Sequence, residues 1–187
     1  MIQLYVEVIM IKPWLYHLLF LLPLFASAQE ANEELLEWST FRKLTWNDYK
    51  AKPNPLSDAA ATTTTYLSIE YKISSSNFSF KIKSLFSKDR SWGRHKDNYI
   101  LSHEQGHFDI AEIFARKLHK KMSEYTFSKR TYQKDLKKIY EEVTNEKEQM
   151  QNDYDRETRH SIDKEKQSEW LKKIAALLQQ HESWADY

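Results

Sequence analysis

One short stretch of the chain, His103-Glu104-Gln105-Gly106-His107, carries residue types that could do metal chemistry. If the stretch is helical, His103 and His107 lie on one face, and Glu104 lies about 100° round the helix from His103. Two neutral imidazoles at this spacing can bind one Zn²⁺, and the neighbouring carboxylate can take a proton from zinc-bound water. The motif therefore predicts a zinc site with Glu104 as the general base.

The residues around the motif favour a helix that packs into a core. Apolar side chains recur at helical spacing through and after it: Leu101, Phe108, Ile110, Ala111, Phe114, Ala115 and Leu118. Gly106 is one of two glycines in the chain, and glycine inside a helix costs about 1 kcal/mol relative to alanine. This cost indicates that backbone or substrate approaches the helix closely there. The alternative is an exposed helix that carries two histidines by chance.

A catalytic zinc site needs a third protein ligand. The chain has no cysteine, and the metal-facing side of the motif helix continues through apolar residues, so the ligand must come from elsewhere. Among the other histidines, His160 is favoured because it follows a second expected helix that can pack antiparallel to the first. The remaining candidates are placed less well: His95, His119 and His181. The alternative for His160 is an ordinary surface histidine beside a helix end.

Two residues shortly before His160 could assist the reaction. Tyr154 offers a phenol that could stabilise an oxyanion, and Asp155 offers a carboxylate that could orient a ligand histidine. We therefore expect Glu104 and Tyr154 to be catalytic and Asp155 to support the metal ligands.

The first thirty residues are typical of an export signal. Lys12 precedes an apolar run over 14–25, and Ala26-Ser27-Ala28 is a cleavage site with small residues at both ends. We expect residues 1–28 to be a signal peptide, with translation beginning at Met10. The mature protein is then exported, to the periplasm or the medium. An uncleaved anchor is disfavoured because the apolar run is short.

Residues 29–187 are expected to form a single domain. Charged residues make up 29% of the chain and aromatic residues 14%, a composition that indicates a globular protein rather than a disordered one. The net charge of +1 gives no indication of a nucleic-acid or membrane partner. The absence of cysteine excludes both a disulfide framework and a thiolate zinc site.

Apolar patterns predict strands first and helices afterwards, which is an α+β fold. Residues 67–73 and 78–83 alternate apolar and polar side chains and predict a β-hairpin. Short strands are expected near 36–38 and 41–46, which would complete a small antiparallel sheet. Three helices are expected, at about 95–123, 132–151 and 163–180. The first of them would be a zincin-like metal helix.

Several segments together resemble one known family. They are Leu44-Thr45-Trp46-Asn47-Asp48-Tyr49, Ser91-Trp92, His103-Glu104-Gln105-Gly106-His107-Phe108-Asp109-Ile110, Ala115-Arg116-Lys117-Leu118, Tyr154-Asp155-x-x-Thr158-x-His160 and Gln167-x-x-Trp170. The chain is similar over most of its length to the domain of unknown function 922 family, exported bacterial proteins described as candidate zinc-dependent proteases. Ser161 departs from the glycine that usually follows the last histidine. The resemblance implies the metal motif and no particular substrate.

We therefore expect an exported zinc-dependent hydrolase, most simply a peptidase acting on a peptide or protein. His103, His107 and His160 would bind Zn²⁺, and Glu104 would activate the water and protonate the leaving amine. Two alternatives stay open: a non-catalytic exported module in which zinc is structural or supports an interaction, and a zinc amidase acting on cell-wall amides. No nucleic-acid partner and no stable membrane insertion after signal cleavage are expected.

Overall fold

The computed structural model describes residues 33–74 and 78–185, which belong to one compact unit. The expected signal peptide, residues 1–28, lies outside the described residues. Within the described part of the chain, no helix has the length and apolar character needed to cross a membrane.

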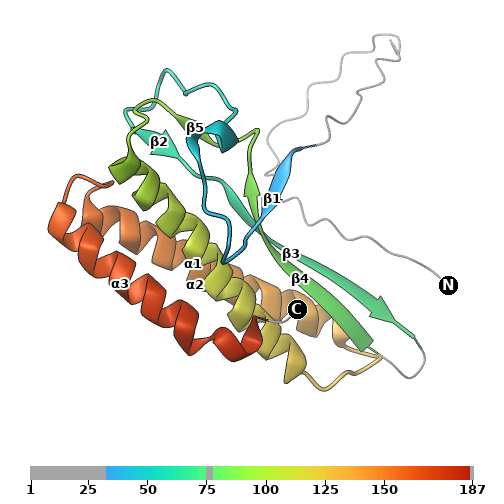
Figure 1. The fold of residues 1–187 in the computed structure, drawn as a ribbon. Coiled ribbons are helices and arrows are strands. Elements are labelled where there is room, and N and C mark those ends of the chain that lie inside the picture. The colour runs from blue at the N-terminus through green and yellow to red at the C-terminus, as the bar shows by residue number, and fades with distance from the viewer. Residues whose placement is uncertain (1–32, 75–77, 186–187) are drawn as a thin grey trace, which may run out of the picture. The chain divides into compact units, whose positions relative to one another are not determined.

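A long antiparallel hairpin forms one side of this unit (Figure 1). Its strands are β3 (Thr65–Ile73) and β4 (Phe78–Ser87), and β1 (Leu35–Glu37) pairs with the other edge of β4, giving the order β1-β4-β3. A separate ribbon pairs β2 (Ala61–Thr62) with β5 (Trp92–Gly93). Residues 59–65 are therefore paired twice: β2 pairs with β5, and Thr65 at the start of β3 pairs with Phe86 of β4.

Three helices complete the fold: α1 (Asn98–Ser123), α2 (Tyr132–Thr158) and α3 (Lys164–Gln180). The first and third begin at aspartate caps, because the Asp97 carboxylate accepts from the Ile100 amide and the Asp163 carboxylate accepts from the Lys166 amide. Short 3₁₀ turns lie at Trp46–Asp48 and Glu182–Trp184. Helix α1 packs against the hairpin, and α2 and α3 pack against α1 and against each other.

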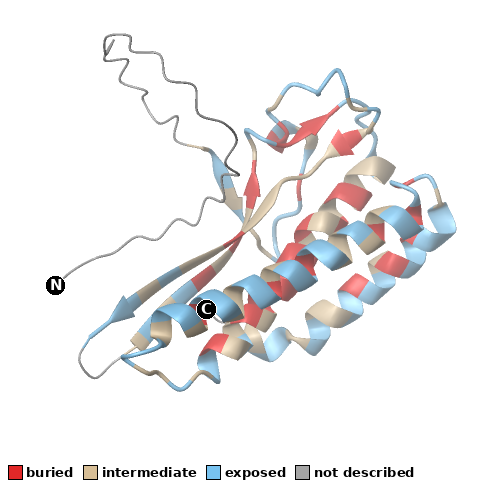
Figure 2. Cartoon of the chain, turned by 180° about the vertical axis from the view of Figure 1, so that it is seen from behind, coloured by how far each residue is buried: buried red, intermediate tan, exposed pale blue. Residues whose placement is uncertain are grey.

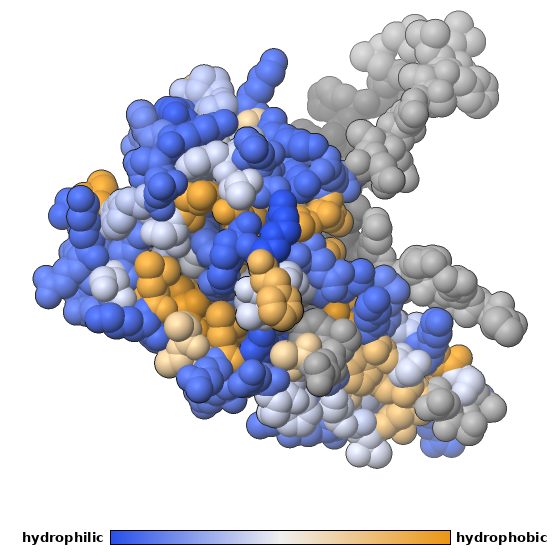
Figure 3. Space-filling model, viewed as in Figure 1, coloured by the Kyte–Doolittle hydropathy of each residue, from blue (hydrophilic) through white to orange (hydrophobic). Residues whose placement is uncertain are grey.

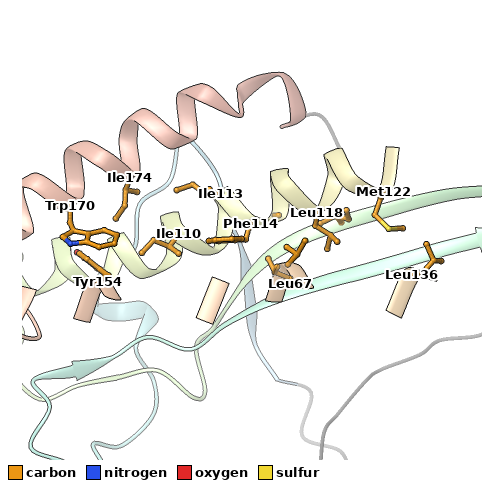
Figure 4. Packing of buried hydrophobic residues seen from close by; sticks show 13 residues of the cluster. Leu67, Ile110, Ile113, Phe114, Leu118, Met122, Leu136, Tyr154, Trp170 and Ile174 are labelled. Atoms are coloured by element: carbon orange, nitrogen blue, oxygen red, sulfur yellow. The ribbon is translucent and has the colours of Figure 1, made fainter. Parts of the chain in front are cut away.

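The hydrophobic core lies between the hairpin and the helices, and α1 supplies much of it (Figure 4). Ile110, Ile113 and Leu118 of α1 are fully buried, as is Ile82 of β4. Figure 2 shows that the buried residues of each helix follow its inward side. Hydrophilic side chains predominate on the face drawn in Figure 3. The α1 helix is therefore held on several sides, as the apolar pattern around the histidine motif predicts.

Most of the expected elements are confirmed. The fold is α+β, the hairpin forms, and the three helices occur in the expected order. The metal-motif helix begins at Asn98 rather than near residue 95, because Asp97 caps it. The third helix matches its expected range closely.

The strand expected at 41–46 is wrong. Side chains take the hydrogen bonds that a partner strand would otherwise form: the Leu44 amide donates to the Gln105 side-chain carbonyl at 2.7 Å, and the Thr45 amide donates to the Asp48 carboxylate at 2.8 Å. Asp48 is buried and also accepts from the Arg42 guanidinium at 2.6 Å. The segment is therefore an irregular loop ending in a 3₁₀ turn, locked by one carboxylate and attached to α1.

The second helix extends to Thr158, beyond the expected end near residue 151. Its buried stripe continues through Tyr154 and Thr158, and the Thr158 hydroxyl donates to the Tyr154 carbonyl at 2.7 Å. The helix stops because residues 159–161 all have positive φ, at 52°, 52° and 69°, which is incompatible with a right-handed helix. Tyr154 and Asp155 are thus helical residues rather than parts of a loop.

Gly106 of α1 lies against the Tyr154 side chain of α2. A Cβ atom on Gly106 would lie 2.5 Å from the Tyr154 hydroxyl oxygen and 2.9 Å from the ring carbon that bears it. The close approach expected from the sequence therefore exists, but a phenol side chain makes it rather than backbone or substrate. Glycine is required here for space and not for backbone conformation.

We expect Gly106→Ala to destabilise the protein by about 1–3 kcal/mol, because overpacking outweighs the gain of about 1 kcal/mol that alanine brings to a helix. Urea unfolding monitored by circular dichroism measures the change. In a Tyr154→Phe background the same substitution should cost less, since the nearest clashing atom is gone. A more stable Gly106→Ala protein would contradict the packing described here.

Candidate metal centre

Three side chains from two helices converge at one point: His103 and His107 of α1, and Asp155 of α2. The Nε2 atoms of both histidines lie 3.1 Å from the same oxygen, Oδ1 of Asp155. Four-residue spacing on α1 places the two imidazoles side by side, with ring centroids 4.9 Å apart. Helix α2 packs antiparallel to α1, and this places the Asp155 carboxylate against both imidazoles.

Two of the separations between these atoms suit a shared metal ion. With metal–ligand bonds of 2.0–2.1 Å, ligand atoms at two corners of a tetrahedron are about 3.3 Å apart. The distances from Asp155 Oδ1 to the two Nε2 atoms, both 3.1 Å, are close to this value, and the ligand atoms of the three residues all lie within 4.8 Å of one another. Two imidazole nitrogens and one carboxylate oxygen are ligands that a divalent cation such as Zn²⁺ accepts.

Gln151 fixes the orientation of one of these ligands. Its side-chain amide nitrogen donates to the His107 backbone carbonyl at 2.9 Å, so its carbonyl oxygen is the atom that faces His107 Nδ1. Because that oxygen can only accept, His107 Nδ1 carries the proton. When His107 is neutral, Nε2 is therefore its unprotonated nitrogen, which is the tautomer that a metal requires, and when Nε2 also carries a proton the imidazolium donates to Asp155.

The electrostatics of the cluster hold Asp155 ionised. Burial raises the pKa of the Asp155 carboxyl, but the hydrogen bonds from His103 and His107 together with the charges of these two imidazoles bring the pKa well below its ordinary value. Burial lowers the pKa of His103. For His107, burial is the largest single effect and acts to lower the pKa, but the hydrogen bond to Asp155, the charges of Asp155 and Glu104 and the hydrogen bond to Gln151 together give a net upward shift. The carboxylate therefore attracts either a proton or a metal cation to the imidazoles beside it.

A cleft of about 500 Å³ opens onto this cluster. One wall is the segment 59–65, and the other walls come from α1 and α2. Glu104 lines the cleft and is only 4% exposed. Its Oε2 accepts from the Thr63 hydroxyl at 2.6 Å, so the carboxylate is anchored to the segment 59–65. The predicted general base thus lies at the cluster and is accessible from the cleft.

His160 lies beside the cluster, at the rim of the cleft. Its Nδ1 is 3.4 Å from Asp155 Oδ1, and 73% of its side chain is exposed. Within the part of the chain that the structure describes, the group whose ligand atoms converge consists of His103, His107 and Asp155, without His160. Asp155, predicted to orient a ligand, is thus in the converging group, and His160, predicted as the third ligand, contacts Asp155 without belonging to that group. Which of the two residues binds a metal stays a prediction.

Tyr154 is buried behind the histidines. Its ring stacks on His103 with centroids 4.4 Å apart, and its hydroxyl donates to the His103 backbone carbonyl at 3.2 Å. Burial and the charge of Glu104 raise its pKa. These contacts support a packing role for Tyr154 beneath the ligands. The predicted role in stabilising an oxyanion remains a prediction without support from this geometry.

Gln151 and Thr63 were not found by sequence reasoning. Gln151 lies one helical turn before Asp155, and knowing that α2 continues to Thr158 would have placed both residues on one face. Thr63 is one of four consecutive threonines, and nothing in the sequence distinguishes the one that reaches Glu104.

In the metal-free protein we expect Asp155→Asn to reduce the free energy of unfolding most between about pH 4 and 6.5. The lowered pKa of Asp155 contributes stability that is present above its ordinary value of 3.8 and is lost as the pH falls through the folded value. The raised pKa of His107 contributes stability that is present below 6.5 and is lost as the pH rises through the folded value. Urea unfolding across this range measures the difference.

The matched control is Asp153→Asn, which removes a carboxylate from α2 that pairs with Arg156 at the surface. The loss in free energy of unfolding that Asp153→Asn causes should show no maximum between about pH 4 and 6.5. An effect of Asp155→Asn that stays constant from pH 3 to 9 would contradict the coupling between the carboxylate and the imidazoles.

Comparison with known proteins gives a family without an assigned activity. The search of curated proteins and the search of solved structures each gave no match. The profile of one family, described as "Bacterial protein of unknown function (DUF922)", matches residues 29–161, which is more than half of the chain. This match includes the histidine motif, Asp155 and His160. The chain therefore belongs to the DUF922 family of bacterial proteins.

Proposed function

We propose that this protein is an exported zinc-dependent hydrolase, most simply a peptidase of the zincin type. The observation that carries the proposal is the convergence of two imidazole nitrogens on one carboxylate oxygen, with Glu104 beside them at a cleft. The two histidines and the glutamate have the helical spacing used by zinc peptidases. Export is part of the proposal and rests on the sequence of residues 1–28.

In this proposal His103, His107 and Asp155 would hold the metal, and all three side chains line the cleft through which a substrate would enter. A zinc ion held there lowers the pKa of a coordinated water to about 7 and polarises the substrate carbonyl. Gln151 keeps His107 in the tautomer that can bind, and Asp155 supplies a negative charge that favours a cation. His160, which the sequence predicts as the third ligand, lies close enough to contact Asp155 but is mostly exposed.

Glu104 then moves the proton of the reaction. It accepts a proton from the attacking water as the water oxygen bonds to the substrate carbonyl carbon, and it gives that proton to the leaving nitrogen as the carbon–nitrogen bond breaks. Its position next to His103 on α1 keeps the carboxylate within reach of a water at the cluster. Hydrolysis of a peptide bond and hydrolysis of a cell-wall amide need the same activated water and the same proton transfer, so the test must use both kinds of substrate.

The third ligand is tested by zinc content. We expect residues 29–187 to retain about one zinc per molecule, and we expect Asp155→Ala to lose most of it because a three-ligand site becomes a two-ligand site. His160→Ala should retain zinc, since its side chain lies outside the converging group. Elemental analysis after dialysis measures each protein. Loss of zinc in His160→Ala with retention in Asp155→Ala would restore the sequence-based assignment.

The catalytic proposal is tested by Glu104→Gln. We expect this protein to keep its zinc and to lose activity by at least about 100-fold, because an amide cannot accept the proton. Fluorescein-labelled casein and purified cell-wall peptidoglycan are the two substrates to assay. Glu141→Gln, at the exposed ion pair with Lys137 on α2, is the matched control and should retain full activity.

A zinc-loaded protein that cleaves neither substrate would contradict the hydrolase proposal, as would full activity in Glu104→Gln. A large fall in melting temperature on zinc removal, together with no cleavage, would indicate a structural zinc site instead. Cleavage of casein would indicate a peptidase, and identification of the products from peptidoglycan would show whether a peptide bond or the amide between sugar and peptide is cut.

A further inference from the structure

Behind Glu104 lies a chain of hydroxyl groups that the proposed mechanism does not use. The Tyr49 hydroxyl is 2.8 Å from the Thr63 hydroxyl, and the Thr63 hydroxyl is 2.6 Å from Glu104 Oε2. The three residues come from separate parts of the fold: Tyr49 follows the 3₁₀ turn Trp46–Asp48, Thr63 lies between β2 and β3, and Glu104 lies on α1. Tyr49 is 5% exposed.

The direction of these hydrogen bonds follows from counting protons. Thr63 has one hydroxyl proton, and an ionised Glu104 can only accept, so Thr63 donates to Glu104 Oε2. Thr63 then has only lone pairs for Tyr49, so Tyr49 donates to Thr63. Burial and the charge of Glu104 raise the pKa of Tyr49, which keeps the phenol protonated and able to donate. Both hydrogen bonds therefore point the same way: Tyr49 donates to Thr63, and Thr63 donates to Glu104.

These hydrogen bonds reach one particular oxygen of Glu104. The Thr63 hydroxyl donates to Oε2, and the Tyr49 hydroxyl in turn fixes the Thr63 hydroxyl. The side chain of Thr63 therefore holds Oε2 and leaves Oε1 for other contacts.

We propose that Thr63 is a positioning residue for Glu104: with Tyr49 behind it, it holds Oε2 and thereby aims Oε1 at the water that the base must deprotonate. This inference rests on the proposed hydrolase function. A glutamate side chain has several rotamers, and a base must lie within hydrogen-bond reach of the proton that it abstracts. The segment 59–65 forms a wall of the cleft, so it both bounds the substrate space and fixes the base.

The test compares Thr63→Val, which has nearly the same shape but no hydroxyl, with Thr63→Ser, which keeps the hydroxyl. We expect Thr63→Val to lower kcat for casein cleavage by about 10–100-fold at unchanged zinc content, and Thr63→Ser to restore most of it. Tyr49→Phe should give a smaller loss, because Thr63 can still donate to Glu104. The controls are Thr144→Val and Tyr140→Phe, which remove hydroxyls that donate to backbone carbonyls away from the cleft.

A crystal structure of each zinc-loaded variant gives a second readout that needs no substrate. We expect the Glu104 carboxylate to keep one position in the wild type and in Thr63→Ser, and to move or occupy several positions in Thr63→Val. An unmoved carboxylate in Thr63→Val, or activity equal to wild type, would overturn the inference. If the wild type cleaves neither substrate, the hydrolase proposal fails, while the carboxylate position still decides whether Thr63 orients Glu104.

Discussion

The contact between α1 and α2 at Gly106 is the constraint on which the candidate site depends. Without a side chain on Gly106, the Tyr154 ring packs directly against α1 and stacks on His103. Asp155 follows Tyr154 on α2 and thereby reaches both histidines at 3.1 Å. If a methyl group separated the helices here, that oxygen would move away from both nitrogens together. One missing side chain thus sets the dimensions of a three-residue cluster.

Two residues form hydrogen bonds to the side chains of the candidate site. Gln151 of α2 contacts the ring and the backbone carbonyl of His107, and Thr63 of the segment 59–65 contacts Glu104. The segment 59–65 is itself connected to the hairpin through β3 and to β5 through β2. The sheets therefore position the residue that would move protons, whereas the helices position the residues that would hold a metal.

The sequence was sufficient to predict the elements that carry strong periodicity. The hairpin follows from the alternation of apolar and polar residues, and the motif helix follows from apolar residues at helical spacing. The four-residue separation of His103 and His107 then places both on one face of that helix. The strand expected at 41–46 failed because side chains of Gln105 and Asp48 replace its partner strand, which no local pattern reveals. Asp155 was predicted to support a ligand rather than to converge with the histidines, because only the remaining histidines were compared as candidates for the third ligand. Once α2 runs to Thr158, residue 155 faces α1.

The fixed orientation of Gln151 has a consequence for the charge of the site. Because His107 keeps its proton on Nδ1, the other ring nitrogen cannot face the Asp155 carboxylate without a positive charge between or upon them. A proton serves when metal is absent. If the site binds zinc as proposed, the metal ion would have to displace that proton, so loading would be an exchange of one cation for another among side chains that are already in place. Acidification would then release the metal by protonating these side chains, and the packing of α1 against α2 through Tyr154 would not depend on the metal.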